Sequence, residues 1–311
     1  MKRRRSTGLA LVTGASSGIG AATALALAER GYRVLAGVRQ LADALPLTTA
    51  SDRIEPIVLD ITVPEHLQSL RDRLALEPLG LSVLVNNAGV LSVGPIELIS
   101  DERWDEVVRV NIVGTIAVTR ASIPSLLRAK GRVVNISSPT GRLALPMFGP
   151  YSVSKFALEA FNDTLRRELR HVGVRVICVT PGMIVTPIFD KGITEGQGVW
   201  DAHDHLPEMH ERYGRLAASA LDAGDQARIV GKPPEAAAAM VIRAVKARYP
   251  RARYRMGLDN HLANTLPRII PDRVLDAVLA QVATKDYAAK APELDLGDLS
   301  RWAAAAAPAQ D

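Results

Sequence analysis

The sequence predicts an α/β protein with a doubly wound parallel sheet of about seven strands. Helices on both faces would give three layers, α/β/α. Short apolar runs rich in β-branched residues alternate with longer helical patterns, which is typical of parallel βαβ units. The runs are continuously apolar, as expected for strands covered on both faces. Hydrophobic residues make up 48% of the 311 residues and charged residues 23%, which favours a soluble globular core over disorder.

Six apolar runs predict the first six strands, and a seventh run follows much later. In chain order they are Leu9–Thr13, Arg33–Val38, Ile54–Leu59, Ser82–Asn86, Arg132–Ser137, Val174–Thr180 and Arg253–Gly257. Apolar residues at helical spacing predict the connecting helices. These cover 19–30, 65–76, 103–129 and 152–171, with a weaker candidate over 40–50 and a further helix from Pro234.

Length alone leaves the number of domains open, because 311 residues at roughly 150 per domain fit two domains or one large one. The strand and helix pattern favours one domain over residues 7–260. The pattern breaks after Pro181, and we interpret 183–232 as a lid or substrate loop, since long excursions of this kind are usually functional. The remaining segments are predicted to be a C-terminal helical extension of the same domain at 261–300 and flexible tails at 1–6 and 301–311.

The net charge of +5 is concentrated at one end of the chain. Four positive charges lie in residues 2–5, so the rest of the chain carries only +1. With 4% aromatic residues, this composition argues against a nucleic-acid partner. The single cysteine, Cys178, excludes an internal disulfide and fits a reducing compartment. No secretory segment is evident and no run reaches about eighteen apolar residues, so we expect a cytoplasmic protein without stable membrane insertion.

A glycine-rich turn, Thr13-Gly14-Ala15-Ser16-Ser17-Gly18-Ile19-Gly20, follows the first predicted strand. Gly14 permits a tight turn, Gly18 allows close approach to a ligand, and Gly20 lets helix and strand pack closely. The helix N-terminus would offer free N–H groups to a pyrophosphate. The segment also matches the GxSxG nucleophile elbow of serine hydrolases around Ser16, although that elbow normally follows several strands. A glycine turn without any ligand is the third interpretation.

Further motifs follow in order: Asn86-Asn87-Ala88-Gly89, Asn111, Ser138, Tyr151-x-x-x-Lys155 and Pro181-Gly182. Together with the glycine turn they resemble the short-chain dehydrogenase/reductase family over roughly residues 7–260. Tyr151 to Phe156 and Arg166 to Leu169 are similar to its hydroxysteroid and retinol dehydrogenase branch. The resemblance implies a Rossmann fold and an oxidoreductase that transfers a hydride between a nicotinamide cofactor and a carbonyl or alcohol.

The spacing of the predicted catalytic residues has a chemical reason. Tyr151 and Lys155 are i and i+4, so they share one helix face. We expect the Lys155 ammonium to lower the pKa of the Tyr151 phenol toward working pH, as a proton donor and acceptor requires. Ser138, just past the fifth strand, is placed to hydrogen-bond the substrate oxygen. The resemblance implies that Lys155 also binds the nicotinamide ribose and that Asn111 holds a proton-relay water. Pro139 departs from the small flexible residues that are usual there in the family.

The end of the second strand predicts which nicotinamide cofactor is bound. Sites that prefer NAD carry an acidic residue there for the ribose 2′-OH, whereas this chain has Val38 followed by Arg39. A guanidinium can pair with a 2′-phosphate, so we predict NADP(H), held there by Arg39 with Ser16 or Ser17. The resemblance assigns further cofactor contacts to Gly14, Gly18, Ile19, Gly20, Asp60 (adenine), Ile61, Asn87, Ala88, Gly89, Tyr151, Lys155, Pro181, Gly182, Ile184 and Thr186 (carboxamide).

The expected substrate is an apolar carbonyl compound or alcohol, such as a steroid, a retinoid or a small ketone or aldehyde. This rests on the branch resemblance and on Leu145, Phe148 and Met183, which we predict beside Ser138 and Tyr151. A protein that senses NADP(H) without catalysis remains an alternative, as does the hydrolase. The family habit implies a homodimer or homotetramer through the two long helices.

Three polar features are predicted to have no functional role. Histidines 203 and 205 are i and i+2 and do not share a helix face, so these residues and His210 predict no metal site. Cys178 is expected to be an inert core residue. A solvated sheet edge is predicted for the cationic residues Lys246, Arg248, Arg251, Arg253 and Arg255.

Overall fold

The computed structural model describes residues 8–203, 206–257, 260–261, 265, 267 and 269–283. Its strands are β1 (Leu9–Thr13), β2 (Arg33–Val38), β3 (Ile54–Val58), β4 (Leu81–Asn86), β5 (Arg132–Ile136), β6 (Arg175–Thr180) and β7 (Arg253–Arg255). They form one parallel sheet in the order β3-β2-β1-β4-β5-β6-β7. The connection from β3 to β4 crosses the sheet, which makes it doubly wound as predicted. Strand order reverses between β1 and β4, where such sheets leave a crevice.

The described helices connect the strands, except for α11, which follows the last strand. They are α1 (Gly18–Glu29), α2 (Leu45–Ala50), α3 (Pro64–Ala75), α4 (Asp101–Val108), α5 (Thr115–Ala129), α6 (Gly149–Leu169), α7 (Pro187–Asp201), α8 (Pro207–Val230), α9 (Pro234–Lys246) and α11 (Asp272–Ala283). A π-helical segment, Arg109–Gly114, joins α4 to α5, and a 3-10 turn, Pro139–Gly141, follows β5. The predicted single helix over 103–129 is therefore continuous but contains one turn of different geometry.

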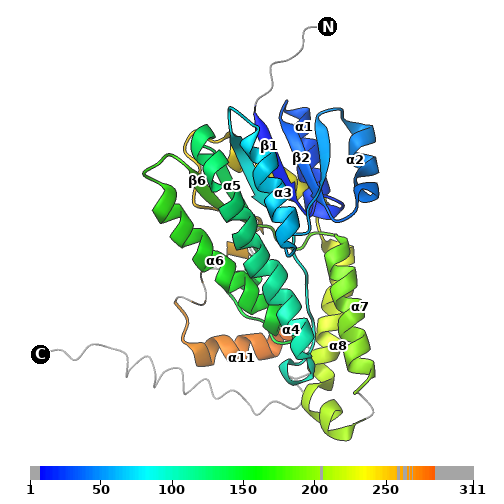
Figure 1. Ribbon diagram of the computed structural model, residues 1–311. Helices are drawn as coiled ribbons and strands as arrows, with labels where there is room; N and C mark the ends of the chain where they lie inside the picture. Colours follow the sequence, from blue (N-terminus) through cyan, green and yellow to red (C-terminus); the bar gives the residue numbers. More distant parts are fainter. Residues whose placement is uncertain are drawn as a thin grey trace, which may run out of the picture.

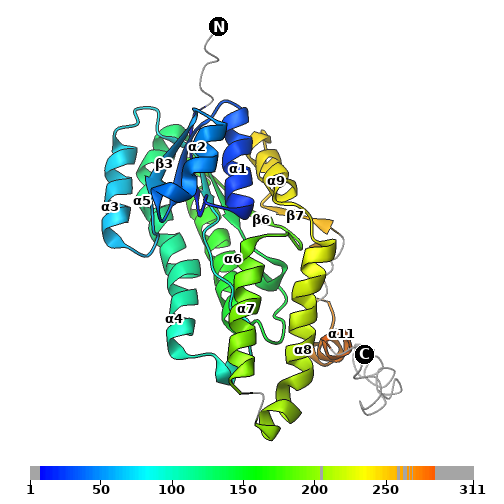
Figure 2. The ribbon, with the colours of Figure 1, turned by 90° about the vertical axis from the view of Figure 1, so that its right-hand side faces the viewer.

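The sheet is covered on both faces, with α3 and α5 on one side and α9 on the other in Figure 2. Alternate strand residues enter two separate apolar cores. Val12 and Val34 pack with Val241 of α9 in one, and Leu11 and Leu84 pack with Leu126 of α5 in the other; all six are buried. The continuous apolarity of the strands thus has the cause expected from the sequence.

The segment predicted as a lid or substrate loop is mostly helical. Helices α7 and α8 form a hairpin at one end of the molecule (Figure 1). Its base is closed by a parallel bridge between Ile184 and Lys232, with Lys232 N donating to Met183 O at 2.9 Å and Val185 N donating to Lys232 O at 3.0 Å. The excursion therefore leaves and re-enters the domain at one point.

The C-terminal part is described only in places. Within the predicted extension 261–300, α11 is helical. Residues 284–300 and the predicted tails 1–6 and 301–311 lie outside the described residues. One described helical stretch, Asp101–Ala129, is long and apolar enough to cross a membrane, but half of its apolar window is buried in the fold, as in the core helix of a soluble protein.

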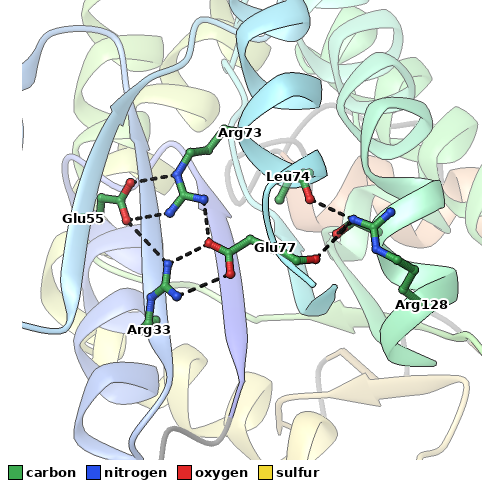
Figure 3. A network of polar contacts seen from close by, with 7 residues as sticks. Arg33, Glu55, Arg73, Leu74, Glu77 and Arg128 are labelled. Atoms are coloured by element: carbon green, nitrogen blue, oxygen red, sulfur yellow. Dashed lines mark hydrogen bonds and ion pairs between the residues drawn. The ribbon is translucent and has the colours of Figure 1, made fainter. Parts of the chain in front are cut away.

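A charged network fastens β2, β3 and α3 together at the sheet edge (Figure 3). Glu77, just after α3, accepts from Arg33 Nη2 at 2.8 Å and from Arg73 Nη1 at 2.6 Å. Arg73 Nη2 also binds Glu55 of β3 at 2.9 Å. The Glu77 side chain is only 13% exposed. Burial alone would raise its pKa, but the hydrogen bonds and charges of Arg73 and Arg33 outweigh this and hold the pKa below its usual range.

We expect Glu77→Gln to lower the free energy of unfolding at pH 7 by about 1 kcal/mol, a melting shift of about 2–4 °C. Because the folded-state pKa is depressed, the contribution of the carboxylate is complete above the unfolded pKa and is lost as the pH falls through the folded one. The difference from wild type should therefore shrink as the pH falls and Glu77 becomes protonated in the folded protein. Thermal unfolding followed from pH 7 down into the acid range measures it. Glu29→Gln, in an exposed pair with Arg30, is the control and should change nothing; an equal loss in both variants would contradict the network's role.

Candidate active site

A cleft of about 430 Å³ opens at the carboxyl ends of the strands, where the strand order reverses. Its wall is formed by the glycine turn after β1, by residues that follow β2, β3, β4, β5 and β6, and by one face of α7. This is where doubly wound sheets bind ligands. The topology therefore brings together motifs that lie up to 170 residues apart in the chain.

The glycine turn forms a cradle that side chains would block. Gly14 and Gly18 have φ angles of +62° and +53°, in the left-handed region that favours glycine. At Gly20 a Cβ would lie 2.1 Å from Gly14 O and 2.5 Å from Asn87 Nδ2, so only glycine lets α1 pack against the turn. The N–H groups of the first turn of α1 have no intrahelical acceptors. Gly18 and Ile19 of this turn line the cleft. The cradle fits the pyrophosphate of a dinucleotide.

The Asn-Asn-Ala-Gly motif after β4 is locked onto this turn. Asn87 Nδ2 donates to the backbone oxygens of Thr13 and Gly14, both at 3.0 Å. Thr13 Oγ1 accepts from the backbone N–H groups of Asn87 and Ala88 at 3.0 Å each. The two loops that would enclose a cofactor thus form one unit.

The opposite end of the cleft carries the residues predicted for the adenosine part. Arg39 is exposed and lines the cleft beside Asp60. Asp60 Oδ1 accepts from Thr62 N at 2.9 Å and from Thr62 Oγ1 at 2.6 Å, which orients its carboxylate. Burial opposes ionisation, but the Thr62 hydrogen bonds and the charge of Arg39 lower the pKa of Asp60. The charge of Arg39 thus acts on Asp60, and both side chains line the same part of the cleft wall.

Asn111 lies behind the cleft wall, in the π-helical segment between α4 and α5. Such π-bulges are frequent at functional sites. Its amide is buried, accepts from Val90 N at 2.8 Å, and donates to Val90 O at 2.8 Å and to Ser154 Oγ at 3.0 Å. It thereby clamps the loop after β4 to α6, one turn from the predicted catalytic tyrosine. A water-holding role stays a prediction.

Ser138, Tyr151 and Lys155 meet in the cleft as the spacing predicts. Lys155 Nζ donates to Ile136 O at 3.0 Å and lies 5.4 Å from the centre of the Tyr151 ring. The Ser138 hydroxyl accepts from Thr140 Oγ1 at 2.9 Å and hydrogen-bonds the Tyr151 phenol. Pro139, the departure noted in the sequence, is at the first position of the 3-10 turn that Ser138 caps, where its fixed φ is favourable.

The expected direction of the tyrosine pKa shift is wrong for the structure as it stands. Burial raises the pKa of Tyr151 to about 12, and the Ser138 hydrogen bond only partly opposes this. Burial also lowers the pKa of Lys155 to about 8, although electrostatic interactions with Cys178 and Glu159 partly oppose this. Desolvation disfavours the charged form of each group and is the largest cause of both shifts. At neutral pH the site holds a protonated phenol beside a largely protonated amine.

Almost every residue predicted at the cofactor lines this one cleft. They are Gly14, Ser16, Ser17, Gly18, Ile19, Arg39, Asp60, Ile61, Asn87, Ala88, Gly89, Tyr151, Lys155, Pro181, Gly182, Ile184 and Thr186. Gly20 lies just behind the wall and has the packing role already described. No histidine is among the residues that line the described part of the cleft, so Ser16 lacks the base that a hydrolase elbow needs.

The predicted substrate residues fit less well. Leu145, Phe148 and Met183 do not line the cleft. Phe148 instead packs in an apolar cluster that also contains Tyr151 and residues of α7, and Met183 is 39% exposed. The sequence predictions missed other wall residues, namely Leu91, Arg103, Glu106, Phe189, Lys191 and Glu195.

Arg253 departs from its prediction, and Cys178 agrees with its prediction but has a partner that the sequence did not indicate. Arg253 does not form a solvated edge: its side chain is 16% exposed and pairs with Glu159 and Asp163 of α6. Cys178 is fully buried and burial raises its pKa, which fits an inert thiol, yet its Sγ donates to Glu159 Oε1 at 2.9 Å. Neither partner is visible from sequence, although Glu159, four residues after Lys155, shares its helix face. Within the described residues no cluster of potential metal ligands occurs.

A sequence model of the family described as short chain dehydrogenase matches residues 8–195. The chain belongs to the short-chain dehydrogenase family. Among its relatives, human retinol dehydrogenase 5 is 38% identical over 290 residues, 90% of each chain. An NADPH-dependent 3-dehydrocapnine reductase from Ornithobacterium rhinotracheale is 34% identical over 279 residues, 86% of this chain and 95% of its own.

Solved structures of other short-chain dehydrogenases have the same fold. One from Streptomyces avermitilis matches with a TM-score of 0.70 and 26% identity, covering 98% of this chain and all of its own. One from Burkholderia cenocepacia, solved in complex with NADP, matches with a TM-score of 0.67 and 28% identity, covering 90% and 99%. The chain is thus an oxidoreductase of this family, and its Rossmann-type sheet is the family's sheet.

Proposed function

We propose that this dehydrogenase interconverts an apolar carbonyl compound and its alcohol with NADP(H) as cofactor. The observation that carries the proposal is the meeting of Ser138, Tyr151 and Lys155 at one end of a cleft that has Arg39 at its other end. A dinucleotide lying across the strand-order reversal spans such a cleft from adenosine phosphate to nicotinamide. When bound, the nicotinamide supplies or accepts the hydride.

The residues of the chain move and hold protons. The Tyr151 phenol, which its raised pKa keeps protonated at neutral pH, donates its proton to the carbonyl oxygen during reduction. Ser138 hydrogen-bonds the same oxygen and orients it. Lys155, fixed by Ile136 O, places a positive charge beside the phenolate that forms, so the attraction missing in the resting site appears when the proton leaves.

Four observations support NADP(H) over NAD(H). No acidic side chain ends β2, and Arg39 faces the cleft where a 2′-phosphate would lie. One relative is named as NADPH-dependent, and one structural neighbour was solved with NADP. A charge-assisted, two-pronged contact from a guanidinium distinguishes the two cofactors better than any apolar contact.

The substrate class follows from the wall near Tyr151. Leu91, Ile188 and Phe189 line it with apolar surface, while Arg103 of α4 pairs with Glu195 of α7 at its rim. Relatives named retinol dehydrogenase point in the same direction. Loss of NADPH absorbance with ketones, aldehydes, retinoids and steroids tests the proposal. Turnover of apolar carbonyls well above that of charged ones of equal size is expected; the reverse order would overturn it.

We also propose a cytoplasmic homodimer or homotetramer without nucleic-acid or membrane partners. Val113 of the π-helical segment and Val153 and Phe156 of α6 are large apolar side chains left about half exposed. Residues of this kind on long neighbouring helices favour association. Sedimentation at micromolar concentration tests the assembly, and a monomer would contradict it.

A further inference from the structure

A buried carboxylate lies one helical turn below the lysine of the active site. Glu159 of α6 is 3% exposed and is the acceptor for three side chains. Arg142 donates from Nε at 3.2 Å and Nη2 at 3.0 Å, Arg253 donates from Nε at 2.9 Å, and Cys178 donates from Sγ at 2.9 Å. The donors come from the loop after the 3-10 turn, from β7 and from β6. Nothing in the proposed chemistry uses this group.

Glu159 is ionised despite its burial. Burial by itself would raise its pKa, but the Cys178 hydrogen bond and the charges of Arg253 and Arg142 outweigh it and lower the pKa. A buried ion needs such compensation, since several kcal/mol are lost when it leaves water. The carboxylate is therefore a fixed negative charge inside the domain at all pH values where the enzyme would work.

This charge is connected to the active site in two ways. Arg142 belongs to the loop that begins at Ser138, so its bond to Glu159 ties that loop to α6. Gly141 of this loop packs so closely against α6 that a Cβ would lie 2.9 Å from Lys155 O and 3.2 Å from Glu159 Cγ. The second connection is electrostatic: Lys155 and Glu159 share a face of α6, and the charge of Glu159 acts on the Lys155 amine.

The groups around the Lys155 ammonium are few. Tyr151 and Glu159 face it from its own helix, Ile136 O from β5 and Cys178 from β6. Arg142 and Arg253 both pair with Glu159, and neither lines the cleft. Of these groups only Glu159 carries a permanent negative charge. It therefore opposes the desolvation that favours a neutral amine.

We propose that Glu159 is a positioning residue whose carboxylate keeps the Lys155 amine protonated and anchors the Ser138 loop through Arg142. The role of Lys155 rests on the proposed function, but its charge can be measured without turnover. A purely structural ion pair would not require a carboxylate at this position. Asp163, one turn further along α6, already binds Arg253 at 2.9 Å and Arg166 at 3.3 Å at a more exposed position.

The test measures how the rate at which an acylating reagent modifies Lys155 depends on pH, in the protein without cofactor and with mass spectrometry as the readout. The midpoint of this pH dependence reports the pH at which the Lys155 amine loses its proton. In Glu159→Gln we expect the pH midpoint of this reaction to fall by about one unit, because the loss of an opposite charge that acts on Lys155 lowers the pKa of its amine. Asp163→Asn is the matched control, because it removes a carboxylate from the same arginines but not from Lys155. Its midpoint should stay with wild type. Equal midpoints in Glu159→Gln and wild type would overturn the proposal.

A second variant moves the midpoint in the opposite direction. Arg253→Gln removes a positive charge beside Glu159, so the Glu159 charge acts more strongly on Lys155 and the labelling midpoint should rise. A general loss of packing would instead move the midpoints of Glu159→Gln and Arg253→Gln in the same direction. Thermal unfolding will show whether Glu159→Gln folds. If it does not, the proposal is tested by Arg253→Gln alone, and an unchanged or lowered labelling midpoint in that variant overturns the proposal. The alkaline limb of kcat/KM for carbonyl reduction should move with the labelling midpoint. Failure of the proposed function would remove turnover in wild type but leave the labelling shifts intact.

Discussion

Tyr151→Phe should lower kcat for carbonyl reduction by about 10²–10⁴-fold, the usual contribution of a positioned proton donor. The phenol lies partly buried in the cleft wall, is held by Ser138, and is protonated at neutral pH because desolvation raises its pKa to about 12. Phenylalanine keeps the ring and its packing and removes only the hydroxyl group, and with it the proton that is transferred. In the oxidation direction the phenol must first lose its proton, so wild-type oxidation should rise with pH while reduction stays level through neutrality.

The measurement is single-turnover NADPH consumption at saturating substrate, with cofactor affinity followed separately by fluorescence. Affinity for NADPH should change little, because the ring and Lys155 remain. Thr140→Val is a useful companion, since it removes the hydroxyl that donates to Ser138 without touching the phenol, and it should have a much smaller effect. Full turnover in Tyr151→Phe would show that the proton comes from elsewhere.

The sheet and the cofactor cleft could be predicted because their signals are local. Each central strand is a short run of β-branched residues, and each motif lies directly after a strand. Parallel topology then brings those strand ends to one edge. Predicted and observed bounds of β1 and β2 coincide, and those of β3 to β6 differ by one residue at an end. Gly20 could be assigned from its motif because the atoms that exclude a Cβ there, Gly14 O and Asn87 Nδ2, belong to the two motifs that line the cleft.

The helical hairpin at 183–232 could not be predicted from local propensity. Helix α7 contains three glycines, which normally disfavour a helix by about 1 kcal/mol each. At Gly192 a Cβ would lie 2.7 Å from Leu91 Cγ, and at Gly196 it would lie 2.8 Å from Val93 O. Gly192 and Gly196 are therefore required for α7 to approach the loop after β4. Tertiary packing overrides propensity here, and a single sequence does not show the packing partner.

The electrostatics of the site were hidden for a similar reason. Sequence spacing places Lys155 beside Tyr151, but it does not reveal that desolvation dominates the pKa of both. The Arg253 and Glu159 pair joins residues 94 positions apart, so an arginine that looks solvated in sequence becomes a buried partner. Both errors concern burial, which depends on the whole fold.

The second large effect is expected at the other end of the cleft. Arg39→Gln should lower kcat/KM with NADPH by about 10–100-fold, because a hydrogen-bonded charge contact contributes roughly 1.5–3 kcal/mol. The same change should leave kcat/KM with NADH nearly unaltered, since NADH has no 2′-phosphate at that position. Arg39 is exposed, so folding is not at risk. The ratio of the two kcat/KM values isolates the phosphate contact from any general damage.

Arg71→Gln is the matched control, an exposed arginine of α3 that binds Gln68 and does not line the cleft. It should leave the cofactor ratio unchanged. An equal fall with NADPH and NADH in Arg39→Gln would mean that the guanidinium shapes the adenosine end without selecting the phosphate, and no fall would mean that Ser16, Ser17 or the α1 N-terminus holds it. Higher salt should reduce the preference of the wild-type enzyme for NADPH over NADH, because salt screens a partly exposed charge contact. The cofactor ratio of Arg39→Gln should depend less on salt, because the backbone N–H groups that would hold the pyrophosphate are screened less.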